Sequence, residues 1–219
     1  MKIQFSRKTW IYAAFIAVSI GAALFYFHPE FSPKATSSRS HATLNNNDKC
    51  RLESGDIILR RGEGLVSDEI SYILKDQPYD ITHSGIIIKQ GDSLFVVHSI
   101  ADHESHVDGV IAQELDKFLL DSRAGSVIVL RYNDMEGKQD ALVQRVLYYL
   151  KKSPPFDFSF DIYDSSKLYC AELLWRIFGD VFHTDIFPIK IHTPTTDLLC
   201  YSSLFKGDSF RIIINQQKL

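Results

Sequence analysis

Residues 82–100 read THSGIIIKQGDSLFVVHSI, which is two runs of mostly β-branched or aromatic residues separated by a short polar stretch. The first run covers residues 86–88 and the second covers residues 94–100. The stretch between them, residues 89–93, contains a glycine followed by an aspartate. Two apolar runs joined by a short glycine-containing connection are typical of a β-hairpin. We therefore predict two antiparallel strands here.

Each predicted strand carries one histidine. His83 lies where the first strand begins, and His98 lies near the end of the second. Because the hairpin brings its strands side by side, the two imidazoles can occupy neighbouring positions on one sheet face. His83 could then act as a general base, with His98 holding its tautomer. The alternatives are a turn histidine bonded to the backbone and an ordinary strand histidine with a polar neighbour.

Cys170 is the candidate nucleophile for such a base. Residues 167–178 have helical apolar spacing, and Asp164-Ser165-Ser166 would cap this helix at its N-terminus. A thiol at a helix N-terminus feels the positive end of the helix dipole, which favours the thiolate. The alternative is that Cys170 is a small buried core residue, as most free cysteines are.

The remaining pattern predicts an α+β fold, because helices are segregated from a group of adjacent strands. Further strands are expected at residues 56–60, 109–115, 126–132 and 210–214, and further helices at residues 65–75, 140–151 and 197–205.

Several other function classes find little support. The net charge of −3 gives no basic surface for nucleic acid. The His- and Asp-containing stretch 98–108 could bind a metal ion, but it lacks a helical His-Glu-x-x-His arrangement and is better explained as a polar loop. A serine hydrolase would need a Gly-x-Ser-x-Gly elbow, which the sequence does not contain. We expect no metal and no organic cofactor.

The N-terminus differs from the rest of the chain. Basic residues precede an uncharged apolar run of 18 residues, 10–27, which predicts a signal anchor or a signal peptide over residues 1–28. Residues 29–50 have the composition of a flexible linker, and the folded domain is expected over residues 51–219. The chain has three cysteines, and the sequence leaves open whether two of them, Cys50 and Cys200, form a disulfide.

Five segments, in this order, resemble the permuted papain-like amidases, which are the YiiX/YebB-type relatives of NlpC-type cell-wall hydrolases. They are Ser54–Ile58, Thr82–Ile86, Phe156–Asp161, Leu168–Leu173 and Thr193–Leu198. The resemblance covers about residues 51–205 and implies a papain-like α+β domain, with the Cys170 helix packed on a small antiparallel sheet.

The resemblance also implies roles for individual residues. The nucleophile of the family falls on Cys170, its base on His83 and its third polar residue on His98. That third residue is often a glutamate in bacterial relatives, so His98 is a departure that matches the lecithin retinol acyltransferase-like branch instead. Tyr169, next to the nucleophile, is expected to support the oxyanion site.

The expected function is a cysteine hydrolase that cleaves an amide in a cell-envelope peptide through a Cys-His-His acyl-enzyme mechanism. One alternative is a lipid acyl hydrolase or acyltransferase acting on a lipid-linked substrate, and another is a non-catalytic envelope-binding domain. The N-terminal helix is expected to tether the chain to a membrane, with the catalytic domain in the periplasm or outside the cell. We expect that membrane to be the bacterial inner membrane.

Overall fold

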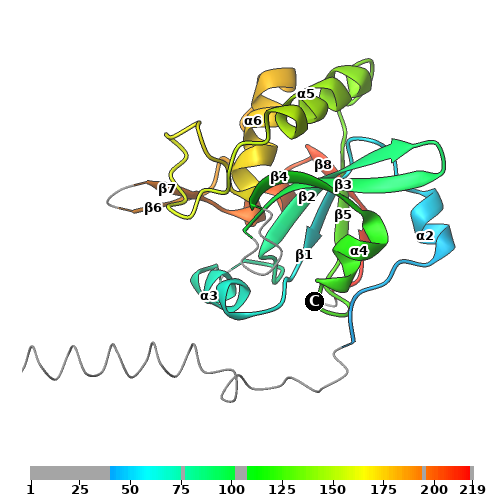
Figure 1. Cartoon of the computed structure of the whole chain (residues 1–219), viewed down its shortest axis with the longest axis horizontal. Helices are drawn as coiled ribbons and strands as arrows, with labels where there is room; N and C mark the ends of the chain where they lie inside the picture. The colour runs from blue at the N-terminus through cyan, green and yellow to red at the C-terminus, as the bar shows by residue number, and fades with distance from the viewer. Residues whose placement is uncertain (1–39, 75–76, 102–107, 194–195, 218–219) are drawn as a thin grey trace, which may run out of the picture. The chain divides into compact units, whose positions relative to one another are not determined.

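The computed structural model describes residues 40–74, 77–101, 108–193 and 196–217, and its centre is an antiparallel sheet of six strands in the order β4-β3-β2-β1-β5-β8 (Figure 1). The strands are β1 (Ile57–Arg60), β2 (His83–Gln90), β3 (Ser93–Ala101), β4 (Asp108–Glu114), β5 (Ile128–Tyr132) and β8 (Phe210–Asn215). A separate hairpin pairs β6 (Lys190–His192) with β7 (Asp197–Leu199). This mixed helix and antiparallel-sheet architecture agrees with the α+β prediction.

Helices cover both faces of the sheet, with α5 and α6 on one side and α4 on the other (Figure 1). The helices are α2 (Asn46–Cys50), α3 (Leu65–Ile73), α4 (Leu115–Leu120), α5 (Gln139–Lys152) and α6 (Cys170–Phe182), followed by the 3₁₀ helix η1 (Tyr201–Phe205). Side chains alternate between the faces, as strands require. In β2, Ile86 and Ile88 pack on the α6 side while Ile87 packs on the α4 side.

The predicted β-hairpin is confirmed as β2 and β3. Ile86 pairs with Val97 and Gln90 pairs with Ser93, so the turn is a tight one at Gly91, whose φ of 59° lies in the left-handed region. Glycine adopts this conformation without the steric penalty that a Cβ atom brings.

A buried ion pair fixes the start of β1. Asp56 has no exposed surface, and its carboxylate accepts two hydrogen bonds from the Arg131 guanidinium, at 2.7 and 2.9 Å. The same carboxylate accepts the backbone N–H of Glu53 at 2.8 Å. Gly55, with φ of 96°, lets the chain turn into the strand just before this contact. The Ser54–Ile58 segment therefore has a structural role in anchoring β1 to β5.

The structure differs from the sequence prediction at several boundaries. The α6 helix begins at Cys170, with Tyr169 as N-cap, and Asp164 instead bonds to Ser166 in a turn of its own. Residues 197–205 form β7 and η1 where one helix was expected, and the short helix α4 was not predicted. Six-residue and 3₁₀ helices are too short for helical periodicity to reveal.

Residues 40–50, which were expected to belong to the linker, lie against the domain. Ala42 and Leu44 are buried, and Asn45 caps α2 by accepting the backbone N–H of Asp48 at 2.9 Å. A few apolar side chains suffice to hold this polar segment, which composition alone does not show. Cys50 is exposed and Cys200 is buried, and each is a free thiol.

The anchor predicted over residues 1–28 lies outside the described residues. Within the part of the chain that the structure describes, no helix has both the length and the apolar character needed to cross a membrane.

Candidate active site

The two histidines meet on the α4 side of the sheet, as the hairpin predicts. Nε2 of His83 lies 2.8 Å from Nδ1 of His98, and the rings are perpendicular with centroids 5.0 Å apart. Both rings also contact Phe118 of α4, at centroid distances of 5.8 and 5.1 Å. His98 has no exposed surface, so the pair is held in a largely apolar environment.

Gly85 provides the space that the pair requires. A Cβ atom at this position would collide with the Val96 side chain and lie 3.2 Å from the Cβ of His98. Only glycine leaves the surface of β2 open enough for the facing strand to carry His98 here.

Gln113 of β4 is a polar residue that the sequence did not single out. The register pairs Gln113 with Val96, so it lies diagonally across from His98 on the same face. Its side chain hydrogen-bonds to His98 and partly opposes the lowering of the pKa of that imidazole. Gln113 Oε1 and His98 Nε2 are both buried, and neither has a partner within full hydrogen-bond distance and angle among the described residues, so this contact is a loose one.

An acceptor beside His98 favours one pair of tautomers. Since Gln113 Oε1 can only accept, it favours the form of His98 that carries its proton on Nε2 and accepts at Nδ1. Nε2–H of His83 then donates to His98, which leaves the lone pair on Nδ1 of His83. In this form Nδ1 of His83 is the unprotonated nitrogen, as a general base requires.

A buried cation, Arg60, lies near the two histidines. Arg60 of β1 pairs with His83 in the sheet, is 4% exposed and lies over the Phe118 ring at 4.2 Å. Burial lowers the pKa of Arg60 to about 10, so the side chain is charged at neutral pH. Burial and the nearby Arg60 charge lower the pKa of His98 to about 3 and the pKa of His83 well below its ordinary value. Both imidazoles are therefore neutral at physiological pH.

Cys170 lies on the opposite side of the sheet, at the first residue of α6. Its sulfur is 3.2 Å from the hydroxyl of Tyr201, which in turn donates to Ser84 Oγ at 3.0 Å. Burial raises the pKa of Tyr201 well above its ordinary value, so this phenol stays protonated; its one proton goes to Ser84 here, and its oxygen can accept from the Cys170 thiol. Nothing in the sequence pattern pointed to Tyr201.

His83 and Ser84 are neighbours in β2 that point to opposite faces, His83 toward Phe118 and Ser84 toward Tyr201. No hydrogen bond joins Cys170 to His83 within the described chain, although the charge of Arg60 reaches both residues. The imidazole of His83 faces Phe118 on the α4 side and the sulfur lies on the other side, so proton transfer between them requires the His83 side chain to turn toward Cys170. The roles expected of Cys170, His83 and His98 thus stay predictions.

The aromatic loop before α6 is organised by Asp157, a buried residue. Its carboxylate accepts the backbone N–H groups of Ser159 and Asp161, at 2.9 and 2.6 Å. Phe160 between them has a φ of 54°, which is unfavourable for a bulky residue, and Thr196 holds its carbonyl at 3.1 Å. Two of the segments that suggested the family, 156–161 and 193–198, therefore act together to place Phe160 beside Tyr169.

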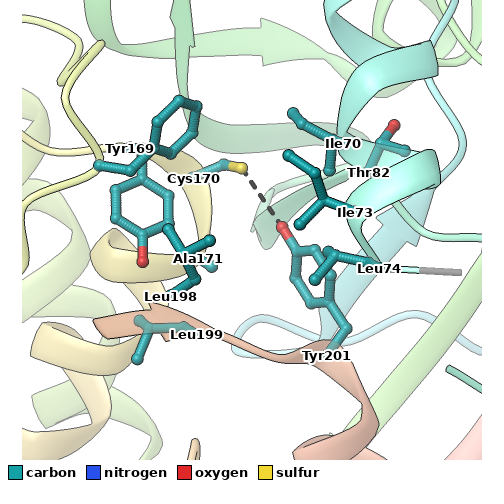
Figure 2. Close-up of a pocket in the computed structure, with 11 residues that line it drawn as sticks. Ile70, Ile73, Leu74, Thr82, Tyr169, Cys170, Ala171, Leu198, Leu199 and Tyr201 are labelled. Carbon is teal, nitrogen blue, oxygen red and sulfur yellow. Dashed lines mark hydrogen bonds between the residues drawn. The ribbon is translucent and has the colours of Figure 1, made fainter. Parts of the chain in front are cut away.

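Tyr169 contributes its ring and not its hydroxyl to the site. The ring packs edge-on against Phe160 with centroids 5.1 Å apart. Burial raises the pKa of Tyr169 well above its ordinary value, and its hydroxyl is directed toward Leu199 and away from the Cys170 sulfur (Figure 2). Its expected support of an oxyanion stays a prediction.

A cavity of about 90 Å³ opens beside the Cys170 sulfur. Ile70 and Ile73 reach into it from α3, facing Cys170, and Leu198 and Leu199 form another wall (Figure 2). Thus the nucleophile candidate, but neither histidine, lies in the wall of this cavity.

Glu172 is a buried carboxyl in the first turn of α6. It forms an ion pair with Arg176 at 2.6 Å, and its Oε2 is buried with no partner in the described structure. Burial raises the pKa of Glu172 to about 7, while Arg176 acts in the opposite direction.

Three comparisons relate the chain to known proteins. Residues 51–194 match the family model described as permuted papain-like amidase enzyme, YaeF/YiiX, C92 family. Among solved structures, the crystal structure of the metalloprotein yiiX from Escherichia coli O157:H7 is similar, with a TM-score of 0.62 and 18% sequence identity. The match covers 75% of this chain and 98% of that chain, and at this identity it concerns the fold alone. A search of curated proteins gave no match.

Among the described residues, the donor set does not fit a resident metal ion, and residues 102–107 of the stretch considered above as a metal site lie outside them. In the described parts of the chain, no three His, Cys, Asp or Glu side chains come together in an arrangement that could hold one. The His83 and His98 nitrogens that face each other are joined by a hydrogen bond. We therefore derive the chemistry from the side chains of the protein itself.

Proposed function

Because the chain belongs to the permuted papain-like amidase family and is a cysteine hydrolase, we propose that it cleaves an amide bond through an acyl-enzyme formed on Cys170. The observation that carries this proposal is the 2.8 Å hydrogen bond between Nε2 of His83 and Nδ1 of His98, since a His83 that donates in this bond keeps Nδ1 as a neutral proton acceptor. The position of Cys170 at the first residue of α6 supports it, since the helix dipole favours negative charge at the sulfur.

The reaction has two steps. The Cys170 thiol gives its proton to His83 as sulfur attacks the carbonyl carbon, and backbone N–H groups at the start of α6 stabilise the oxyanion. The C–N bond then breaks, and the amine leaves with the proton from His83. Water attacks the thioester, returns a proton through His83, and releases the carboxylic acid and the free thiol.

Arg60 supports this use of His83 as a base. An imidazole that is already protonated cannot accept the proton of the thiol. The buried guanidinium and the apolar surroundings disfavour a second positive charge on the α4 side of the sheet. His83 is therefore available as a base even in mildly acidic solution.

The substrate expected from the sequence is an amide in a cell-envelope peptide, with membrane tethering through residues 1–28. A second candidate is a lipid acyl hydrolase or acyltransferase. The apolar walls of the cavity beside Cys170 favour this second class.

Burst kinetics with p-nitrophenyl acetate test the acyl-enzyme in the full-length chain. We expect about one p-nitrophenolate per chain in the burst, with the acetyl group located on Cys170 by mass spectrometry. Cys170→Ser and His83→Gln should each abolish the burst, whereas Cys200→Ser, which removes the other buried thiol, should keep it. A burst that survives His83→Gln, or an acetyl group found elsewhere, would contradict the proposal and favour a non-catalytic envelope-binding domain.

A further inference from the structure

The cavity beside Cys170 is apolar on almost every side. Its walls come from Ile70, Ile73 and Leu74 of α3 and its C-cap, from Leu198 and Leu199 of β7, and from aromatic rings. Thr82 lies at its edge, and the hydroxyl of Thr82 already donates to Ser67 and accepts from the backbone of Gly62. The hydroxyl of Tyr201, which also lines the cavity, is engaged with Cys170 and Ser84.

No charged side chain lines this cavity among the described residues. The cation of Arg60 and the two histidines lie on the α4 side of the sheet, and Glu172 is paired with Arg176. A polar or charged group that entered the cavity would lose hydration without gaining a partner. An aliphatic group would gain about 0.8 kcal/mol per buried methylene, which corresponds to about fourfold in a rate or binding constant.

The position of the Cys170 sulfur indicates whether the acyl part or the amine part of the substrate lies in this cavity. Cys170 is in the cavity wall, and its sulfur points into the space between Ile73 and Tyr201 (Figure 2). The acyl group stays covalently attached to this sulfur after the first step, whereas the amine must leave and water must enter. The apolar lining of the cavity therefore suits the acyl group, which stays on the enzyme.

We propose that the cavity binds a straight aliphatic acyl group, so that the substrates of this enzyme are fatty acyl amides or esters. This inference rests on the acyl-enzyme mechanism proposed above. The volume of about 90 Å³ has room for about three water-sized groups, and a methylene is similar in size. Chain length should therefore matter most over the first few methylenes beyond the carbonyl.

A series of p-nitrophenyl esters tests the proposal in the full-length chain. We expect the rate constant for acylation of Cys170 to rise roughly fifteenfold from acetate to butyrate, which is two methylenes, and to level off in longer chains. The p-nitrophenyl monoester of adipic acid has the length of the hexanoate ester but ends in a carboxylate. It should react at least about tenfold more slowly than hexanoate, because no cation faces the cavity.

A matched pair of variants separates the cavity from general hydrophobic adsorption. Ile73 is 54% exposed and lines the cavity, while Ile212 is 46% exposed on β8 and does not. Ile73→Trp should remove the rate advantage of hexanoate over acetate, and Ile212→Trp should leave that advantage as in the wild type.

The outcomes distinguish the two proposals. If Cys170 is acetylated but the rate is independent of chain length, or if Ile73→Trp has no effect, the fatty acyl proposal is wrong and the acyl-enzyme stands. Equal rates for adipate and hexanoate would exclude an apolar acyl site and favour a peptide substrate. If acetate itself does not label Cys170, the proposed mechanism fails.

Discussion

The sulfur of Cys170 lies 3.2 Å from the hydroxyl of Tyr201, a phenol that burial keeps protonated because it raises the pKa well above its ordinary value. As negative charge develops on the sulfur, this hydroxyl can turn its one proton from Ser84 Oγ to the sulfur. A hydrogen bond to a charged group contributes about 1.5–3 kcal/mol. We expect Tyr201→Phe to slow the alkylation of Cys170 by iodoacetamide at pH 7 by roughly tenfold or more, measured site by site with mass spectrometry. Tyr148→Phe, at an exposed position, is the control and should not change the rate.

Arg60 sets the protonation state of the histidine pair, and its removal should appear in the pH–rate profile. Arg60→Met takes away a charge that lowers the pKa of His83 and of His98. The pKa of His83 should therefore rise, and the acidic limb of kcat/KM should move to higher pH. The profile of acyl-ester hydrolysis from pH 4 to pH 8 measures this shift. An acidic limb that stays in place in a folded Arg60→Met protein would exclude this electrostatic role.

Gln113 is expected to act as a positioning residue that fixes the tautomer of His98. Gln113→Leu removes the acceptor for Nε2–H, so His98 can carry its proton on Nδ1 and oppose the hydrogen bond from His83. We expect kcat to fall roughly tenfold while KM changes little. Imidazole ¹⁵N chemical shifts should show the change of tautomer at His98, which a merely structural defect would not produce. Gln113→Glu keeps an acceptor and should restore the shifts toward those of the wild type.

Breaking the Asp56–Arg131 pair should destabilise the fold. Asp56 is fully buried, and Asp56→Asn leaves the Arg131 guanidinium without its negative partner. Removal of one member of a buried ion pair costs about 3–5 kcal/mol in the free energy of unfolding, and Asn retains part of the hydrogen bonding, so we expect about 3 kcal/mol. Urea denaturation measures this loss. Asp140→Asn, at an exposed position, should change the free energy of unfolding by less than about 0.5 kcal/mol.

The buried carboxyl of Glu172 makes the free energy of unfolding depend on pH. The direction is opposite to that of a carboxyl group whose pKa is lowered by folding. Burial raises the pKa of its folded-state carboxyl from 4.5 to about 7, so the neutral form is favoured in the folded protein. Its stabilising contribution is present below pH 4.5 and is lost as the pH rises through about 7. Glu172→Gln, which is neutral at every pH, should therefore become more stable relative to the wild type as the pH rises from 5 to 8. Thermal unfolding across this range measures the difference, with Glu114→Gln as the exposed control. A difference that is independent of pH would show that Glu172 keeps its ordinary pKa.

The sequence predicted the hairpin that brings His83 and His98 together, because alternation and turn composition act locally. It also predicted strands near β1, β4, β5 and β8 and the helices around α5 and α6. The family, and with it the cysteine hydrolase class, followed from five short segments in order. Those segments have distinct physical roles here, since Asp56 anchors a strand and Asp157 shapes a loop.

The rest of the site depends on contacts that local patterns do not contain. Tyr201 reaches Cys170 from 31 positions away in the chain, and Gln113 becomes a partner of His98 only through the register of β3 and β4. Arg60 is the last residue of an apolar strand. A charged residue in such a run was the one local feature of the sequence that could have indicated a role for Arg60. The first residue of α6 was misplaced because Asp164-Ser165-Ser166 has the composition of an N-cap but bonds within its own turn.

The opposite orientations of His83 and Ser84 have a consequence for folding. A slip of β2 by one residue would turn every side chain of the strand to the other face. His83 would then leave Phe118, and Ser84 would leave Tyr201, so the base and the support of the thiol would be lost together. A chain with this register shift would be inactive rather than partly active. The size of the burst in a refolded sample would therefore count the molecules whose central hairpin has paired correctly, and activity would serve as a direct readout of strand alignment.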